Sequence, residues 1–163
     1  MSELVAITGG AGFIGSHLAE GFLKAGYAVR IVDNLTTGSL DNLMRIRNRT
    51  DFQQFDIRDV RSLEQAFRGV SIVLHHAGIS SVERSFEDLT WTHKVNVTGT
   101  LNVLNAAARA GVRRVIMRLP PPSTGTIDRN SKSKTRSFLP PLPHALWKWM
   151  GQLYAEHFAK TTT

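Results

Sequence analysis

The sequence contains no cysteine among its 163 residues, which excludes disulfides and thiolate metal sites. No apolar run approaches the roughly 18 residues that a membrane span needs, and no charged-then-apolar leader precedes the first apolar segment. These absences predict a cytoplasmic protein with no membrane partner. The length predicts one domain over residues 1–163 with a buried core.

Proline is missing from most of the chain, because all six prolines lie between Pro120 and Pro143. Positive charge is concentrated in the same region. Residues 109–148 hold nine Lys and Arg against one acid, whereas the rest of the chain holds 11 basic and 12 acidic residues. The net charge of +7 therefore belongs to one stretch rather than to a binding face, and we expect no nucleic-acid partner.

The N-terminal segment has the pattern of a dinucleotide site: an apolar strand, spaced glycines, an amphipathic helix and a strand ending on an acid. Gly9 permits a tight turn, Gly12 lets the backbone approach a pyrophosphate, and Gly15 lets the helix pack closely on the strand. Asp33 follows Gly15 by 18 residues, where a carboxylate accepts hydrogen bonds from the adenosine ribose. The pattern predicts NAD rather than NADP, because the Asp33 carboxylate would repel the extra phosphate of NADP.

Apolar strands and amphipathic helices alternate through residue 116. The expected strands are Leu4–Thr8, Ala28–Asp33, Phe52–Phe55, Ser71–His75 and Arg114–Met117. The expected helices are Gly12–Ala25, Val60–Phe67 and Leu89–Ala110, with a shorter turn at Ser39–Ile46. Such alternation predicts an α/β fold, a Rossmann-type doubly wound parallel sheet with helices on both faces.

The alternation breaks at Met117. Prolines then remove the backbone donors that a strand or helix needs, and the residues between the proline clusters are polar without periodicity. We expect residues 117–147 to be irregular. Helical spacing of apolar residues returns at Trp147 and predicts a helix over residues 148–160.

As an ordered set, several motifs resemble the extended short-chain dehydrogenases, and most closely the NAD-dependent epimerase/dehydratase family with its nucleotide-sugar epimerases of the UDP-glucose 4-epimerase type. The matching segments are Thr8–Gly15, Asp33–Gly38, Asp56–Asp59, His75–Gly78, Val95–Leu104 and Lys148–Glu156. The resemblance covers about residues 3–116 and 148–160. It implies a nucleotide-sugar substrate, a homo-oligomer and a C-terminal substrate lobe, before which we expect this chain to be truncated.

The resemblance also implies which residues line the cofactor. Asn96 is then the asparagine that braces the backbone of the active site. The implied NAD-binding residues are Gly9, Gly12, Phe13, Ile14, Gly15, Asp33, Asn34, Asp56, Ile57, His76, Ala77, Gly78, Asn96 and Lys148. No metal site is expected: His75 and His76 are adjacent in a strand, so they point to opposite faces, and no acid or cysteine clusters with them.

The catalytic motif of the family is incomplete. The family places a serine-rich segment after the fifth strand and then a tyrosine four residues before a lysine. The tyrosine acts there as general base, and the lysine lowers its pKa. Lys148 matches the lysine, but His144 occupies the tyrosine position and Leu119–Pro122 replaces the serines. The resemblance thus implies an enzyme family, whereas these replacements predict a catalytically impaired chain.

A shifted reading frame would account for the prolines, the clustered charge and the missing catalytic motif of residues 117–147 together. Codons for Tyr-Ala-Ser-Ser-Ala-Ala-Val-Tyr-Gly, an ordinary family segment, give Met-Arg-Leu-Pro-Pro-Pro-Ser-Thr-Gly when read one base late, which is the sequence of residues 117–125. We infer that about residues 117–147 are translated out of frame, with a genuine insertion as the alternative. Three functions remain open: part of an epimerase, part of a related dehydratase or decarboxylase, or a non-catalytic NAD-binding module.

Overall fold

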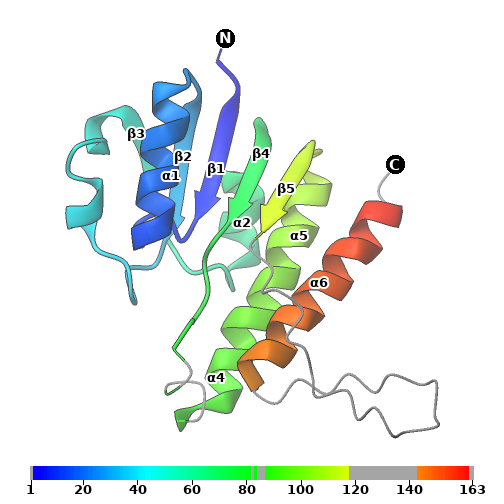
Figure 1. Cartoon of the computed structure of the whole chain (residues 1–163). Helices are drawn as coiled ribbons and strands as arrows, with labels where there is room; N and C mark the ends of the chain where they lie inside the picture. The colour runs from blue at the N-terminus through cyan, green and yellow to red at the C-terminus, as the bar shows by residue number, and fades with distance from the viewer. Residues whose placement is uncertain (1, 82, 84–86, 118–142, 162–163) are drawn as a thin grey trace, which may run out of the picture.

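The computed structural model describes residues 2–81, 83, 87–117 and 143–161. Five parallel strands form one sheet in the order β3-β2-β1-β4-β5, with helices on both faces (Figure 1). The strands are β1 (Leu4–Thr8), β2 (Ala28–Asp33), β3 (Thr50–Gln54), β4 (Val70–His75) and β5 (Arg114–Met117). The helices are α1 (Phe13–Lys24), α2 (Val60–Ala66), α4 (Leu89–His93), α5 (Thr100–Arg109) and α6 (Pro143–Thr161). This arrangement confirms the Rossmann-type α/β fold.

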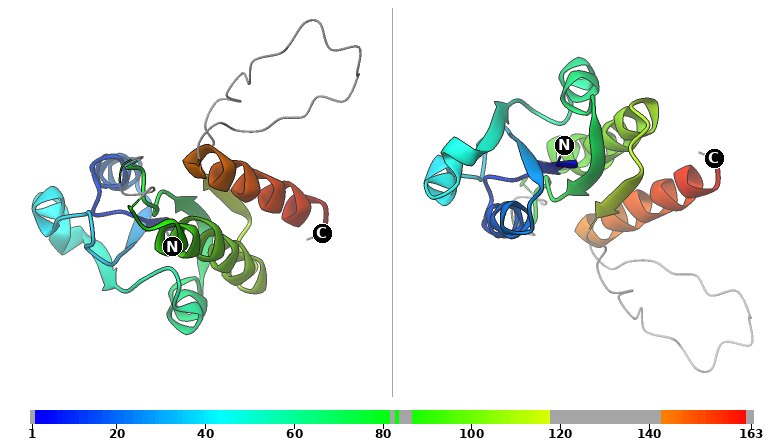
Figure 2. Two further views of the ribbon diagram at one scale, coloured as in Figure 1. Left: turned by 90° about the horizontal axis from the view of Figure 1, so that it is seen from below. Right: turned by 90° about the horizontal axis from the view of Figure 1, so that it is seen from above.

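The sheet separates two apolar cores. Helix α1 covers one face, and α2 and α5 cover the other (Figure 2). Strand β1 lies at the centre, and its residues Val5, Ala6 and Ile7 are fully buried. An unbroken apolar run is what a parallel strand needs when both of its faces are covered. None of the described helices is long and apolar enough to cross a membrane.

The helix expected over Leu89–Ala110 is interrupted. A π turn over Lys94–Gly99 separates α4 from α5, and the sequence pattern did not indicate it. The turn brings Asn96 toward the backbone of Ile79, with which its side chain makes two hydrogen bonds. The π turn therefore coincides with a contact to a segment that is distant in sequence. Such turns occur frequently at functional sites.

Two other boundaries differ from expectation by two residues or more, and several differ by one. Strand β3 begins at Thr50, two residues before the expected start. Helix α6 begins at Pro143, before the expected return of order at Trp147, because a proline fits the first helical turn, where its missing N–H has no partner to lose. Trp147 is buried at 5 % exposure, and α6 packs along α5 and the π turn. The rest of the segment expected to be irregular, residues 118–142, lies outside the described residues.

Candidate functional site

The carboxyl ends of β1 to β4 open into a cavity of about 450 Å³, a size typical of ligand sites. Such sheets bind ligands at this edge. Of the residues predicted to contact the cofactor, the cavity is lined by Gly9, Gly12, Phe13, Ile14, Gly15, Asp33, Asn34, Asp56, Ile57, His76, Ala77, Gly78 and Asn96. The side chains of Lys148 and His144, both in α6, lie outside the described part of the chain. The structure thus gathers segments that are far apart in sequence.

The glycine turn after β1 forms the cavity floor. Gly9 has φ +71°, a left-handed conformation that glycine adopts without strain, and its N–H donates to Val32 O at 2.8 Å. Helix α1 then begins at Phe13, and its N-cap residue, Gly12, has no side chain that could accept a hydrogen bond from the first N–H groups. The first N–H groups of α1 are therefore left for an anion, and the helix dipole favours one there.

Gly15 holds this turn against α1 and leaves no room for a side chain. A Cβ at this position would lie 2.2 Å from Gly9 O. We expect Gly15→Ala to move the turn, to lower the free energy of unfolding by about 1–3 kcal/mol and to weaken dinucleotide binding. Gly21→Ala in the same helix is the matched control, because a Cβ there meets nothing within 4 Å. Urea denaturation should show Gly21→Ala unchanged or more stable; equal losses in both variants would contradict the steric account.

Asp33 ends β2 with its carboxylate in the cavity wall and only 8 % of the residue exposed. One carboxylate oxygen accepts the N–H of Ala11 at 2.9 Å, and the other accepts the N–H of Leu35 at 2.8 Å. These two bonds fix the carboxylate. Because each oxygen offers about two acceptor positions, one on each remains for a ligand hydroxyl.

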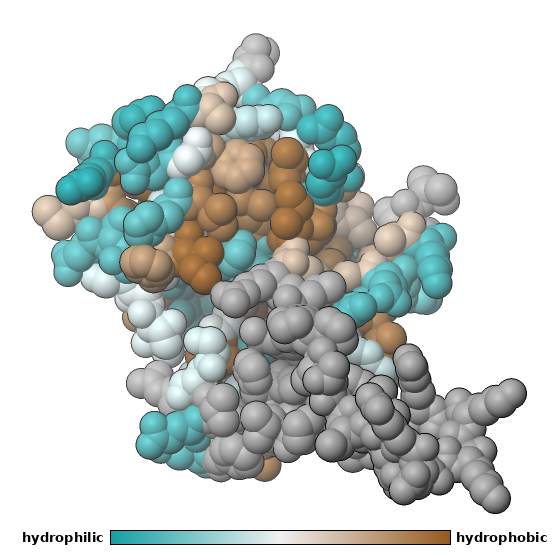
Figure 3. All heavy atoms as spheres, in the orientation of Figure 1, coloured by the Kyte–Doolittle hydropathy of each residue, from teal (hydrophilic) through white to brown (hydrophobic). Residues whose placement is uncertain are grey.

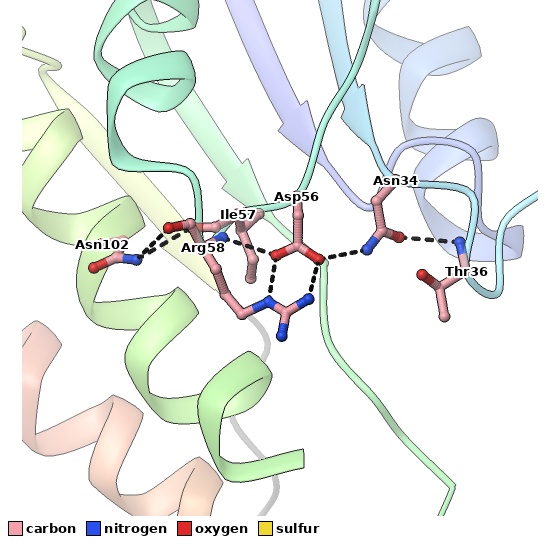
Figure 4. Close-up of polar contacts among 6 residues, drawn as sticks. All are labelled: Asn34, Thr36, Asp56, Ile57, Arg58 and Asn102. Atoms are coloured by element: carbon pink, nitrogen blue, oxygen red, sulfur yellow. Dashed lines mark hydrogen bonds and ion pairs between the residues drawn. The ribbon is translucent and has the colours of Figure 1, made fainter. Parts of the chain in front are cut away.

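Asp56 extends the polar wall beyond β3 (Figure 4). It accepts hydrogen bonds from Asn34 and Arg58, and the guanidinium of Arg58 holds the pKa of this carboxyl below its usual value. Asn34 in turn accepts the N–H of Thr36 at 3.0 Å. The cavity therefore has two carboxylates, one at the end of β2 and one in the loop that follows the neighbouring strand β3.

Asn96 braces the opposite wall. Its side-chain oxygen accepts the N–H of Ile79 at 2.8 Å, and its amide donates to Ile79 O at 2.9 Å. Both backbone groups of one loop residue are thereby satisfied by one side chain. Gly78 lies directly against Asn96, since a Cβ on it would approach the Asn96 oxygen to 3.0 Å. The loop after β4 is thus held by the π turn.

His75 was not among the residues predicted to contact the cofactor, although it begins the segment His75–Gly78, on which the family resemblance partly rests. It is buried below the cavity, with Nδ1 2.7 Å from Thr8 Oγ1 and Nε2 3.0 Å from Thr100 Oγ1. Because Thr100 donates its hydroxyl to Asn96 O, we assign the His75 proton to Nε2, which leaves Nδ1 to accept from Thr8. Burial, with a smaller effect from His76, lowers the pKa of His75 to about 4, so the ring is neutral near pH 7.

Among the described residues, no group of three or more His, Cys, Asp or Glu side chains is placed to hold a metal ion. His75 and His76 therefore belong to no metal centre in this part of the chain. Other cavity-lining residues were not singled out individually in the sequence. They are Val32, Thr36, Thr37, Phe55, Ile79, Ser80, Trp91, Val95, Met117 and Gly151. Four of them, Thr36, Thr37, Val95 and Gly151, fall in the segments Asp33–Gly38, Val95–Leu104 and Lys148–Glu156, on which the family resemblance rests.

The sheet order, the glycine turn after β1 and the cavity at the carboxyl ends of the strands are those of a Rossmann-type fold. Residues 5–162 match the NAD dependent epimerase/dehydratase family, and the chain belongs to it. Among curated relatives, it is 41 % identical to the UDP-glucose 4-epimerase of Neisseria gonorrhoeae over 118 residues, which are 69 % of this chain and 35 % of that protein. The human UDP-glucose 4-epimerase is 35 % identical over 128 residues, 71 % of this chain and 37 % of that protein.

Solved structures show the same likeness. The UDP-glucose 4-epimerase of Thermotoga maritima superimposes with a TM-score of 0.85 at 31 % identity, over 98 % of this chain and 52 % of that one. The dTDP-glucose 4,6-dehydratase of Streptomyces venezuelae, solved with bound NAD, gives 0.83 at 34 % identity, over 97 % of this chain and 52 % of that one. The chain spans about half, or less, of the length of these relatives.

Proposed function

We propose that this chain is the NAD-binding portion of a nucleotide-sugar epimerase of the UDP-glucose 4-epimerase type, with an impaired catalytic motif. The observation that carries NAD binding is the buried Asp33 carboxylate, fixed in the cavity wall near the uncapped N-terminus of α1. An anion-binding helix end beside a hydroxyl-accepting carboxylate fits a dinucleotide. The NAD-bound structures of relatives support the same assignment.

In this proposal each part of the cavity has one task. The N–H groups at the start of α1 bind the diphosphate, and Asp33 accepts the ribose hydroxyls. Asn96 holds the loop of residues 76–79, which lines the cavity on the β4 side. When bound, NAD would supply the group that accepts a hydride from the sugar carbon and gives it back.

The catalytic part of the proposal rests on the sequence. By family resemblance, Lys148 would hold the nicotinamide ribose and assist a tyrosine base, but His144 stands where the tyrosine is expected. The impairment therefore follows from residues 117–147 and not from the cavity. Resequencing the coding DNA over this interval discriminates a shifted frame from a genuine insertion.

A related dehydratase or decarboxylase is the second candidate, because a dTDP-glucose 4,6-dehydratase superimposes nearly as well as the epimerases. A non-catalytic NAD-binding module is the third, and coding DNA without a shifted frame would favour it. Binding and turnover assays separate these functions: the module binds NAD without turnover, and a dehydratase releases water from its nucleotide sugar.

We also propose that the chain forms a homo-oligomer. Leu89 on α4 and Leu153 on α6 are exposed apolar residues, and the family resemblance implies subunit contacts on the helices that carry them. Apolar side chains also gather over the front of the sheet (Figure 3), and Ile116, at the β5 edge, is 43 % exposed. Exposed apolar surface of this kind favours association, which light scattering over a dilution series would test.

The Asp33 carboxylate should determine the choice between NAD and NADP. Asp33→Asn removes the charge but keeps an oxygen that accepts a backbone N–H. We expect NAD binding to weaken by about 1–3 kcal/mol and the preference over NADP to shrink, because the 2′-phosphate no longer meets a carboxylate. Asp51→Asn, on β3 and outside the cavity, is the control. Calorimetric titrations that give both variants the same NAD-to-NADP ratio would rule out this role.

A further inference from the structure

The carbonyl group of Ala11, in the middle of the glycine turn, is held by two donors from outside the turn. Its oxygen accepts the side-chain amide of Asn42 at 2.8 Å and the backbone N–H of Ser39 at 3.0 Å. Ala11 is fully buried, and Asn42 is 31 residues away in sequence. Neither Ser39 nor Asn42 lines the cavity, so the Ala11 oxygen is directed at residues outside the place where we propose that the diphosphate binds.

The peptide group between Ala11 and Gly12 leads directly into α1. On its other side, the N–H of Gly12 donates to Gly9 O at 3.2 Å. Because glycine tolerates a wide range of φ values, Gly12 by itself does not fix the orientation of this peptide group. Any rotation of the group would misdirect the first N–H groups of α1, which begins at the next residue, Phe13. The shape of the turn therefore depends on the two donors that hold the Ala11 oxygen.

Asn42 belongs to a short 3₁₀ turn over Leu40–Leu43 that is anchored on the core. Leu43 is fully buried in the apolar cluster on the α1 face of the sheet, and Ala11 belongs to the same cluster. The side chain of Ser39, the N-cap of this turn, accepts a backbone N–H of the turn. The fold itself, and not a ligand, therefore sets the position of Asn42.

We propose that Asn42 is a positioning residue for the dinucleotide: it holds the Ala11 peptide group so that the first N–H groups of α1 face the diphosphate. The inference rests on the proposed NAD site. A turn that is already ordered binds more tightly, because the ligand does not have to order it. The ribose site depends less on Asn42. The Asp33 carboxylate accepts the N–H of Ala11, but it is also fixed by the N–H of Leu35.

The test compares NAD, which contains a diphosphate, with adenosine, which contains only the base and the ribose. Calorimetric titration of the full chain measures NAD, and ligand-observed NMR measures the weaker adenosine. Asn42→Ala should weaken NAD about fivefold, as expected for one hydrogen bond, and adenosine by less than about twofold. Asn42→Gln, which keeps an amide donor on a longer side chain, should recover part of the loss in NAD binding. This second comparison does not depend on adenosine.

Asn48→Ala is the matched control, because Asn42 and Asn48 are both exposed residues of 3₁₀ turns outside the cavity. It should bind NAD as the native chain does. Unchanged NAD binding in Asn42→Ala, or the same dissociation constant for NAD in Asn42→Ala and Asn42→Gln, would overturn the proposal. Equal weakening of NAD and adenosine, or loss of folding in urea denaturation, would assign Asn42 a general role in stability and would also overturn it. If the native chain binds neither ligand, the proposed NAD site itself is wrong.

Discussion

Supplied with NAD and UDP-glucose or UDP-galactose, this chain should interconvert the two sugars about 10²–10⁴-fold more slowly than an epimerase with an intact Tyr-Lys motif, because a positioned general base contributes about that factor. The family mechanism needs a base at the sugar hydroxyl, and Lys148 alone does not replace the tyrosine. The measurement is a coupled assay of UDP-galactose conversion at saturating NAD.

His144→Ala is the informative variant for this assay, because His144 occupies the tyrosine position. We expect any residual rate to be unchanged in His144→Ala, since the imidazole differs from a tyrosine in reach and pKa. Turnover at a normal epimerase rate that disappears in His144→Ala would show that the histidine serves as the base. The account of an impaired chain would then be abandoned.

The second large effect is a loss of stability in mild acid that depends on His75. Burial lowers the pKa of His75 from 6.5 to about 4 in the folded chain. Below pH 6.5 the unfolded chain therefore takes up a proton that the folded chain does not. The stabilisation is complete above pH 6.5 and is lost as the pH falls toward 4, a change of about 3 kcal/mol in the free energy of unfolding.

Urea denaturation at half-unit steps from pH 4 to pH 7 measures this slope. His75→Gln should be less stable at neutral pH, because its contacts with Thr8 and Thr100 are altered, but its stability should be nearly independent of pH between pH 5 and pH 7, above the range in which carboxyls such as Asp56 take up protons. His17→Gln, which replaces an exposed histidine on α1, should keep the slope of the native chain. A slope that survives in His75→Gln would assign the proton uptake to another group.

Much of the fold and cavity could be predicted because the signals are local. The apolar run of β1, the glycine turn and the acid at the end of β2 occur within one short stretch, and each follows from backbone or hydrogen-bond requirements. Parallel strands bring their carboxyl ends to one edge, so motifs after β1 to β4 were expected to meet there. The structure places the predicted residues around one cavity for this reason.

The features that were missed depend on distant contacts. The π turn accompanies a pairing of Asn96 with Ile79, and the ring of His75 makes its hydrogen bonds with Thr8 and Thr100, which are 67 and 25 residues away in sequence. The spacing of apolar and polar residues along the sequence carries no information about such pairs. The start of α6 was missed for a different reason: Pro143 was read as a helix breaker, although the first helical turn accepts proline.

The central claim is that the cavity at the end of the sheet binds NAD, and one calorimetric titration of the purified chain tests it most directly. The account predicts saturable binding of one NAD per chain, with NADP about tenfold or more weaker, because the additional 2′-phosphate of NADP would be repelled by Asp33, where NAD offers ribose hydroxyls that donate charge-assisted hydrogen bonds. Absence of saturable binding at millimolar NAD, or equal affinity for the two dinucleotides, would contradict it.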